Sequence, residues 1–459
     1  MLRSAPFRAA VVVSLTAAAF AMARCSSEMS DADRAPASSA VRASSGFTVT
    51  PLLLPDGSSE QAITIGKDGT MAITSLSWLK FFTDVWKGPF GSTPAYQGSQ
   101  MDANIGKSVG GGDADIDIGS TGTLHATTLV FFFNPNFNAL QLGVSAITCP
   151  GADTSNNFTN CKAQILDQTQ SDRQWITSDG ARVYVAYHDS GNSSLVHVQR
   201  SDDDGFTFKR AGDPIVAQGN VTGGSTFNNE NGPIVADPIS HNVYDVYAAG
   251  EPGIQKATSA TFNHVYVSRS IDFGKSWTAT QVFEAPLFHA LNNIFPSLAV
   301  DPTDGTLYAV WSDAATVALS KSTDQGSTWS APVTVSSAPN NSAVFPWVAA
   351  RNGTVDVVFY GTPATSKDDP SAVWNVFMSK STDAGAHFTQ VQVSKTPNHV
   401  GVICTNGTGC APGTRNLLDL FEVAIDPRSG KAAMAYTDDT LTKQANGSPL
   451  PQAVLAQEQ

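Results

Sequence analysis

The chain has 459 residues, a formal net charge of −13 and a sequence pI near 4.9, and only 15% of its residues are charged. Gly, Ser, Thr, Asn and Pro are abundant, which is typical of many short strands joined by turns and excludes a protein built from long helices. The acidic balance excludes nucleic acid as an expected partner and argues against binding to anionic membrane surfaces.

The first 24 residues read as a signal peptide. Arg3 and Arg8 are followed by an apolar run over 9–23, which is too short to span a membrane. Cys25 comes directly after, and the polar stretch 25–46 reads as a disordered tether. This arrangement resembles a bacterial lipoprotein acylated at Cys25, although Arg24 departs from the usual lipobox. We therefore expect export, either as a surface or outer-membrane lipoprotein or as a periplasmic or extracellular protein, with membrane contact only through that anchor.

Seven strand–turn–strand units follow in chain order over residues 60–440. The clearest copy is Phe295–Trp311, in which two strands flank the turn Asp-Pro-x-x-Gly. The other six begin at Glu60, Asp113, Asp172, Asn231, Phe345 and Asp419. A strand at 47–54 precedes the first unit and another follows at 452–457, so the N-terminal strand could complete the last unit and close a ring.

Four units are followed by an S-x-D-x-G box with an aromatic residue at its end. The boxes comprise Ser201, Asp203 and Gly205; Ser270, Asp272 and Gly274; Ser322, Asp324 and Gly326; and Ser381, Asp383 and Gly385. We expect the Asp to accept hydrogen bonds from the turn and the Gly to supply a positive φ. The regular spacing favours an architectural role for these carboxylates over a catalytic one.

The five cysteines form two local pairs and one remainder. Cys149 pairs with Cys161 and Cys404 with Cys410 on this hypothesis, which leaves Cys25 for an anchor. Free thiols are the alternative, and the absence of a CxxC motif argues against a metal site.

The repeated boxes resemble the Asp-box, or BNR, repeats of the sialidase superfamily. This resemblance implies an all-β fold over residues 47–459, a single β-propeller of four-stranded blades. We expect seven blades, with six as the alternative. Similar boxes also occur in sortilin-type receptors, some glucanases and photosystem assembly factors, so the fold does not determine the function.

The resemblance further implies three arginines that clamp a sialate carboxylate, a Tyr–Glu nucleophile and an acid/base Asp. This chain has no Arg-Ile-Pro motif and no Arg between Ser45 and Cys149. Only Arg173 and Arg415 lie near the start of an innermost strand. The sialidase site is therefore expected to be absent or heavily altered.

Acidic residues gather at the expected starts of the innermost strands, where they would meet at one mouth of the ring. They are Glu60, Asp113, Asp115, Asp172, Glu230 with Asn231, Asp419 and Glu422. Such carboxylates could bind Ca²⁺, hydrogen-bond sugar hydroxyls or supply an acid/base pair. The plainer interpretation is that they are solvated or paired with one another and with the two arginines.

Three functional hypotheses follow for what we expect to be a monomer. The leading one is a scaffold that binds glycan or protein at the mouth. The second is a sialidase-like exo-glycoside hydrolase, with Arg173 and Arg415 as anion clamp and Asp113, Asp172 or Asp419 as acid/base. The third is a rigid platform in the cell envelope.

Overall fold

The computed structural model describes residues 42–44, 46–99, 108–134, 139–189, 195–215, 229–250, 262–291 and 293–459. The predicted signal peptide, Cys25 and most of the predicted tether lie outside these residues. The end of that tether, Arg42–Ser44, forms the short strand β1. None of the helices in the described part of the chain is long and apolar enough to cross a membrane.

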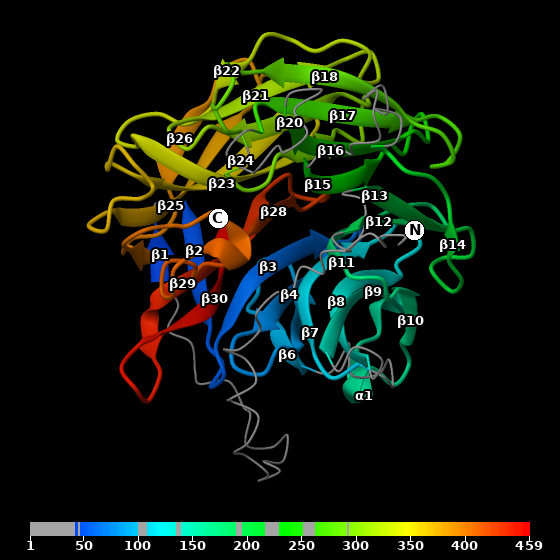
Figure 1. Cartoon of the computed structure of the whole chain (residues 1–459), viewed down its shortest axis with the longest axis horizontal. Helices are drawn as coiled ribbons and strands as arrows, with labels where there is room; N and C mark the ends of the chain where they lie inside the picture. Colours follow the sequence, from blue (N-terminus) through cyan, green and yellow to red (C-terminus); the bar gives the residue numbers. More distant parts are fainter. Residues whose placement is uncertain are drawn as a thin grey trace, which may run out of the picture. The chain divides into compact units, whose positions relative to one another are not determined.

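Seven antiparallel sheets form the blades of a ring, so the predicted all-β propeller with seven blades is confirmed and the alternative of six is not (Figure 1). Blades 1 to 3 contain β3 (Ser58–Ile65), β4 (Thr70–Ser77), β5 (Thr83–Pro89) and β6 (Ala95–Gly98); β7 (Gly111–Ile118), β8 (Leu124–Asn134), β9 (Ala139–Cys149) and β10 (Lys162–Asp167); and β11 (Ser171–Asp179), β12 (Arg182–Asp189), β13 (Val196–Ser201) and β14 (Lys209–Arg210).

The remaining blades follow in chain order. Blades 4 to 6 contain β15 (Asn229–Ala236), β16 (Val243–Ala249), β17 (His264–Ser270) and β18 (Thr278–Glu284); β19 (Ser297–Val300), β20 (Leu307–Ser312), β21 (Val317–Ser322) and β22 (Val333–Thr334); and β23 (Ser342–Arg351), β24 (Thr354–Thr362), β25 (Val373–Ser381) and β26 (Thr389–Gln392), with β27 (His399–Val400) also paired to β25. Blade 7 contains β28 (Glu422–Ile425), β29 (Ala432–Lys443), β30 (Pro449–Glu458) and β2 (Phe47–Leu52), with β1 at its edge.

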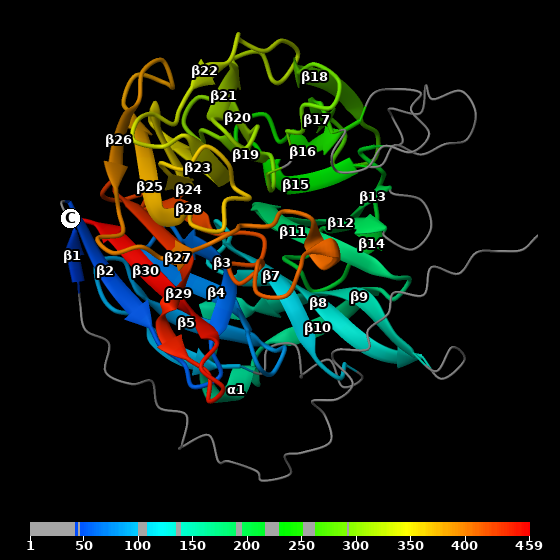
Figure 2. The ribbon, with the colours of Figure 1, turned by 60° about the vertical axis from the view of Figure 1, so that its left-hand side comes forward.

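The ring closes as the sequence predicted, through the N-terminal strand. β2 pairs antiparallel with β30, and Figure 2 shows β1 and β2 alongside it. The side chain of Gln452 reinforces the seam, because it accepts a hydrogen bond from Leu54 N at 2.9 Å and donates one to Leu54 O at 3.0 Å. Joining the two ends of the chain in one sheet removes an open edge that would otherwise remain in blade 7.

Each blade packs on its neighbours through both faces, which explains the composition of the second strands. All seven residues of β16 and all six of β20 are buried. Such strands are apolar almost throughout instead of alternating, because neither face reaches water. The buried Tyr184, Tyr244 and Tyr308 lie near the starts of β12, β16 and β20, each opposite the residue before the box serine.

The four S-x-D-x-G boxes form the turns between the third and fourth strands of blades 3 to 6. In the first box, Ser201 Oγ donates to Asp203 Oδ1 at 2.7 Å, and Asp203 Oδ1 accepts Thr207 N at 2.8 Å. Gly205 N donates to Ser201 Oγ at 2.9 Å. The other three boxes repeat these contacts, so all four aspartates are engaged within their own turns.

The box glycines also join neighbouring blades. Gly326 and Gly385 have φ values of 77° and 76°, which other residues adopt only with strain. A Cβ at Gly385 would lie 3.4 Å from the ring of Tyr308 in the preceding blade, and one at Gly326 would lie 3.6 Å from Tyr244. Each box therefore packs against the blade before it.

Both predicted disulfides are present. Cys149 and Cys161 have Cα atoms 4.2 Å apart, and those of Cys404 and Cys410 are 5.8 Å apart. The first pair closes the loop between β9 and β10, which contains η3 (Pro150–Ala152) and α1 (Ser155–Phe158), and so takes the place of a box in blade 2. The second lies in the long loop before blade 7, which contains η6 (Gly407–Gly409).

Candidate functional site at the ring mouth

A β-bulge shapes the start of several innermost strands. The register against the second strand shifts by one residue in β3, β7, β11, β15 and β23. Glu60, Arg173 and Phe345 occupy the same position in three of these bulges, with φ values of 55°, 55° and 58°. A bulge re-aims its side chain, and a positive φ at a residue other than glycine persists only where the surroundings hold it.

Arg173 is the centre of the polar cluster at this mouth. Its Nη2 lies 2.5 Å from Asp419 Oδ2, and its Nη1 lies 3.5 Å from Asp113 Oδ2. Its guanidinium carbon lies 4.9 Å from the centre of the Phe295 ring. The side chains of Arg173 and Asp113 remain 17% and 18% exposed, so the cluster is open to solvent at these two residues.

Asp419 receives both arginines of the mouth. Arg415 Nε donates to Asp419 Oδ1 at 2.9 Å, while Arg415 Nη2 and Arg173 Nη2 both contact Asp419 Oδ2. Burial of this fully enclosed carboxyl opposes ionisation, yet Arg173 and Arg415 lower the pKa of Asp419 to about 2. The two guanidinium groups and the carboxylate therefore form a charged unit in which the anion belongs to the chain itself.

The pKa values of Glu60 and Asp172 are shifted in the opposite direction from that of Asp419. Burial raises the pKa of Glu60 well above its usual range, and the nearby Asp113 and Asp419 raise it further. Burial also raises the pKa of Asp172 to about 6, although Arg173 opposes the rise. The cluster therefore combines two carboxyls whose pKa is raised, Glu60 and Asp172, with one whose pKa is lowered, Asp419.

Glu230 and Asn231 support Arg173 from blade 4. Asn231 Nδ2 donates to Arg173 O at 3.0 Å, and the indole of Trp175 donates to Asn231 O at 3.2 Å. The negative charge of Glu230 favours the charged form of Arg173. These contacts hold the strained backbone of the bulge and keep the guanidinium at the mouth.

Asp115 and Glu422 lie elsewhere, which differs from the expected mouth position. Asp115 Oδ2 accepts Ile176 N at 2.7 Å, and Glu422 Oε2 accepts Ile63 N at 3.0 Å, so each carboxyl bonds to the next blade. Both carboxyls therefore face the neighbouring sheet. Burial raises the pKa of Asp115 to about 7 and that of Glu422 well above its usual range.

Aromatic side chains from non-adjacent blades fill the centre of the ring beneath the cluster. The ring of Trp175 in blade 3 lies 5.4 Å from Phe295 before blade 5 and 5.3 Å from Trp347 in blade 6. Tyr360 and Phe421 stack nearby at 4.4 Å. All five are buried, so the mouth is a polar site on an aromatic plug. Nothing in the spacing of Trp175 and Trp347 along the sequence indicates that they meet.

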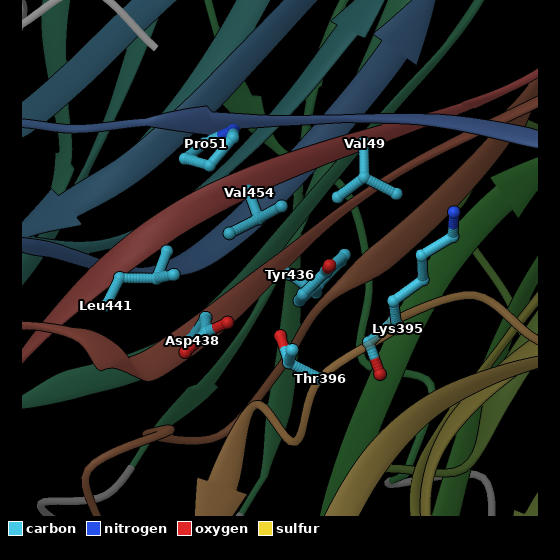
Figure 3. A pocket seen from close by; sticks show the side chains of 9 residues that line it. Val49, Pro51, Lys395, Thr396, Tyr436, Asp438, Leu441 and Val454 are labelled. Atoms are coloured by element: carbon cyan, nitrogen blue, oxygen red, sulfur yellow. The ribbon is translucent and has the colours of Figure 1, made fainter. Parts of the chain in front are cut away.

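No group of three or more His, Cys, Asp and Glu side chains among the described residues is arranged to hold a metal ion. The carboxyl of Asp419 is bound by two arginines, so this geometry gives no support to the calcium alternative. A separate hollow at the seam of blade 7, between Val49, Tyr436 and Val454, measures only about 20 Å³ (Figure 3). That is room for about one water molecule.

Comparison with known proteins identifies the repeat type. Residues 178–372 match the family described as "BNR repeat-like domain". A search of the curated proteins found no match. Among solved structures, a protein of unknown function from Dyadobacter fermentans is 13% identical, with a TM-score of 0.45 over 72% of this chain and 95% of that one.

Two further solved structures are named as sialidases. The endosialidase of phage phi92 is 11% identical, with a TM-score of 0.48 over 90% of this chain and 69% of its own. The intramolecular trans-sialidase of Ruminococcus gnavus is 12% identical, with a TM-score of 0.42 over 87% and 94%. The family match over residues 178–372 and the seven-bladed ring bear out the predicted BNR-repeat propeller: this chain is a seven-bladed β-propeller that is similar, over that segment, to BNR repeat-like domains.

Proposed function

We propose that this protein is an exported scaffold that binds a neutral glycan at the mouth of its propeller. One observation carries the proposal: Arg173 and Arg415 both converge on Asp419. Guanidinium groups placed in this way are suited to a carboxylate, and here a buried carboxylate of the chain already occupies them. A carboxylate ligand would have to displace Asp419.

Displacement would be costly. Asp419 is fully buried, and breaking a buried charge pair without replacing it costs about 3–5 kcal/mol. The mouth also holds more carboxyl groups than guanidinium groups, so its electrostatic balance disfavours another anion. An acidic sugar is therefore a poor ligand for this arrangement.

A neutral sugar fits better. Asp113 and Asp172 have carboxyl oxygens that can accept hydrogen bonds from hydroxyl groups, and the side chain of Arg173 is 17% exposed beside them. The aromatic plug provides an apolar base for the site. A protein ligand would have to present similar hydroxyl or amide groups to this small surface, which makes a glycan the simpler choice.

Hydrolysis of a glycoside is the second candidate, favoured by the divergent titration of the mouth carboxyls. Asp172, with a pKa near 6, could donate a proton beside carboxylates that stay ionised, as acid/base pairs of glycosidases do. In this version Arg173 and Arg415 hold the substrate, and Asp113 or Asp419 acts as the second carboxylate.

Two measurements on the purified protein separate these functions. Aryl glycosides, including aryl sialosides, report turnover by fluorophore release, and neutral oligosaccharides report binding by calorimetry. We expect binding without release, with binding weakened by Asp172→Ala and Arg173→Ala. Release that disappears with Asp172→Ala would make the protein a hydrolase. Absence of both binding and release would favour a rigid platform.

A further inference from the structure

A large cavity lies beside the mouth and takes no part in the function proposed above. Its volume is about 690 Å³, within the range of about 300–1,000 Å³ that is typical of small-molecule sites. It is lined by the chain after β4, by β27, by the loop that carries Arg415, and by the hairpin between β29 and β30. The lining residues are Trp78, His399, Val400, Gly413, Asn416, Asp439, Thr440, Lys443, Gln444, Ser448 and Pro449.

The floor of the cavity is a buried polar unit. His399 Nδ1 lies 2.9 Å from Asp439 Oδ2, and Asn416 Nδ2 donates to the same oxygen at 2.8 Å. The other ring nitrogen of His399 lies 3.2 Å from Val402 O. The His399 and Asp439 side chains are only 3% and 5% exposed. A carboxylate has about four acceptor positions, so Asp439 is held rigidly and still has capacity for a ligand.

The walls and rim are neutral apart from one lysine. Trp78 is half-buried at the cavity wall, and Val400 is exposed beside it. Thr440, Gln444 and Ser448 supply hydroxyl and amide groups. Among the described residues that line the cavity there is no arginine, and the one carboxylate, Asp439, is bound to His399. A flat indole with several neutral polar groups suits a ligand that is apolar on one face and rich in hydroxyls at its edge.

The loop before blade 7 connects this cavity to the mouth. Arg415 binds Asp419 in the mouth cluster, whereas the next residue, Asn416, binds Asp439 in the cavity floor. Consecutive residues have Cα atoms about 3.8 Å apart, so one short segment serves both sites. The mouth cluster and the cavity floor are therefore joined through this segment.

We propose that the cavity bounded by Trp78, Asn416 and Asp439 is a second subsite, which binds a neutral pyranose unit of a glycan. The proposal rests on the function assigned to the mouth and extends it: the mouth holds one part of the oligosaccharide and the cavity holds a neighbouring sugar. Trp78 packs against the apolar face of the ring, while Asn416 and Asp439 hydrogen-bond its hydroxyl groups.

The test is calorimetric titration of the purified full chain with neutral tetrasaccharides of β-1,4-linked glucose, xylose, mannose and galactose. Tetragalacturonate serves as an anionic probe. We expect at least one neutral tetrasaccharide to bind, and Trp78→Ala and Asn416→Ala each to weaken it about tenfold, as loss of a central contact residue does. Trp78→Phe should retain part of the affinity.

Leu79→Ala is the matched control, because Leu79 adjoins Trp78, is 50% exposed and does not line the cavity. It should leave the affinity within about twofold. The melting temperature of each variant verifies folding. The proposal is overturned if no neutral tetrasaccharide binds, if tetragalacturonate is preferred, or if both cavity variants bind as tightly as Leu79→Ala does.

Asp172→Ala separates this proposal from the function of the mouth. Weakening by Asp172→Ala but not by Trp78→Ala would keep the mouth as the glycan site and overturn the second subsite. Weakening by Trp78→Ala but not by Asp172→Ala would support the cavity and overturn the assignment of the mouth. Weakening by both supports one oligosaccharide across both sites.

Discussion

The centre of the ring has a polar side and an aromatic side, and the same bulged backbone occurs in both. Blades 7, 1, 2 and 3 supply Asp419, Glu60, Asp113 and Arg173, a charged group that remains partly open to solvent. Blade 6 places Phe345 at the bulge position that Glu60 and Arg173 occupy in blades 1 and 3. The repeated bulge thus sets where a side chain points, and the residue type decides whether it binds or packs.

A substitution on the polar side that removes one charge should lower the stability of the protein more than a substitution on the aromatic side. Replacing Asp419 with Ala leaves two guanidinium groups together without their shared anion, and we expect the free energy of unfolding to fall by about 3–5 kcal/mol. Denaturant titration measures the loss. Asp419→Asn, which keeps the size of the side chain, should lose less. A loss below about 1 kcal/mol for Asp419→Ala would show that the arginines find other partners.

The aromatic side should affect stability without affecting recognition. Trp347→Ala removes a nearly buried ring that packs 5.3 Å from Trp175, and we expect a loss of about 3 kcal/mol in unfolding free energy. Glycan affinity should change less than it does in Arg173→Ala, measured where both variants are folded. Equal losses of affinity would mean that the aromatic plug takes part in binding and would weaken the contrast.

A substitution in an S-x-D-x-G box, away from the ring centre, shows how much stability a purely architectural residue contributes. Gly326→Ala forces a side chain into φ of +77° and toward Tyr244, so we expect a loss of about 1–2 kcal/mol in unfolding free energy. Glycan affinity should be unchanged. Gly353→Ala is the matched control, since Gly353 has φ of +71° but open space around its Cβ position. Gly353→Ala should lose stability through backbone strain alone. The difference between the two variants then measures the effect of the contact with Tyr244.

The stability of the polar side should also depend on pH. The folded pKa of Asp172 is raised to about 6, whereas an unfolded Asp titrates near 3.9. Its contribution to stability is therefore fully present below about pH 3.9 and is lost as pH rises through about 6. Asn does not titrate, so Asp172→Asn should gain stability relative to wild type between pH 4 and pH 7. Melting temperatures at both pH values test this, and a constant difference would contradict it.

Much of the site could be anticipated because it follows from repeat position. Glu60, Asp113, Asp172 and Asp419 begin or precede innermost strands, and the spacing of the units assigned them to one mouth. Asp115 and Glu422 were predicted to lie there on the same grounds, but Asp115 lies past the bulge of β7, and both carboxyls bond to the next blade. A shift of one residue changes the face of a strand, and composition gives no sign of where that shift falls.

The sequence indicates the cavity less clearly than it indicates the mouth. Residues 394–421 separate two units by an unusually long stretch that contains a disulfide and no box, which marks an elaborated loop. The stretch includes His399 and Asn416, but Asp439 comes from the next unit and Trp78 from the opposite end of the chain. Only folding brings them to one cavity.

The sequence by itself determined the repeated architecture: the seven units, the boxes, both disulfides and ring closure through the N-terminal strand. These features depend on local turn chemistry and on spacing along the chain, and both can be recognised from the sequence alone. The tertiary structure alone decided that Asp419 neutralises both arginines, that Trp175 meets Trp347 across the ring, and that His399 and Asp439 share the floor of a cavity. Each of these contacts joins different blades, and their geometry is set only when all seven sheets close.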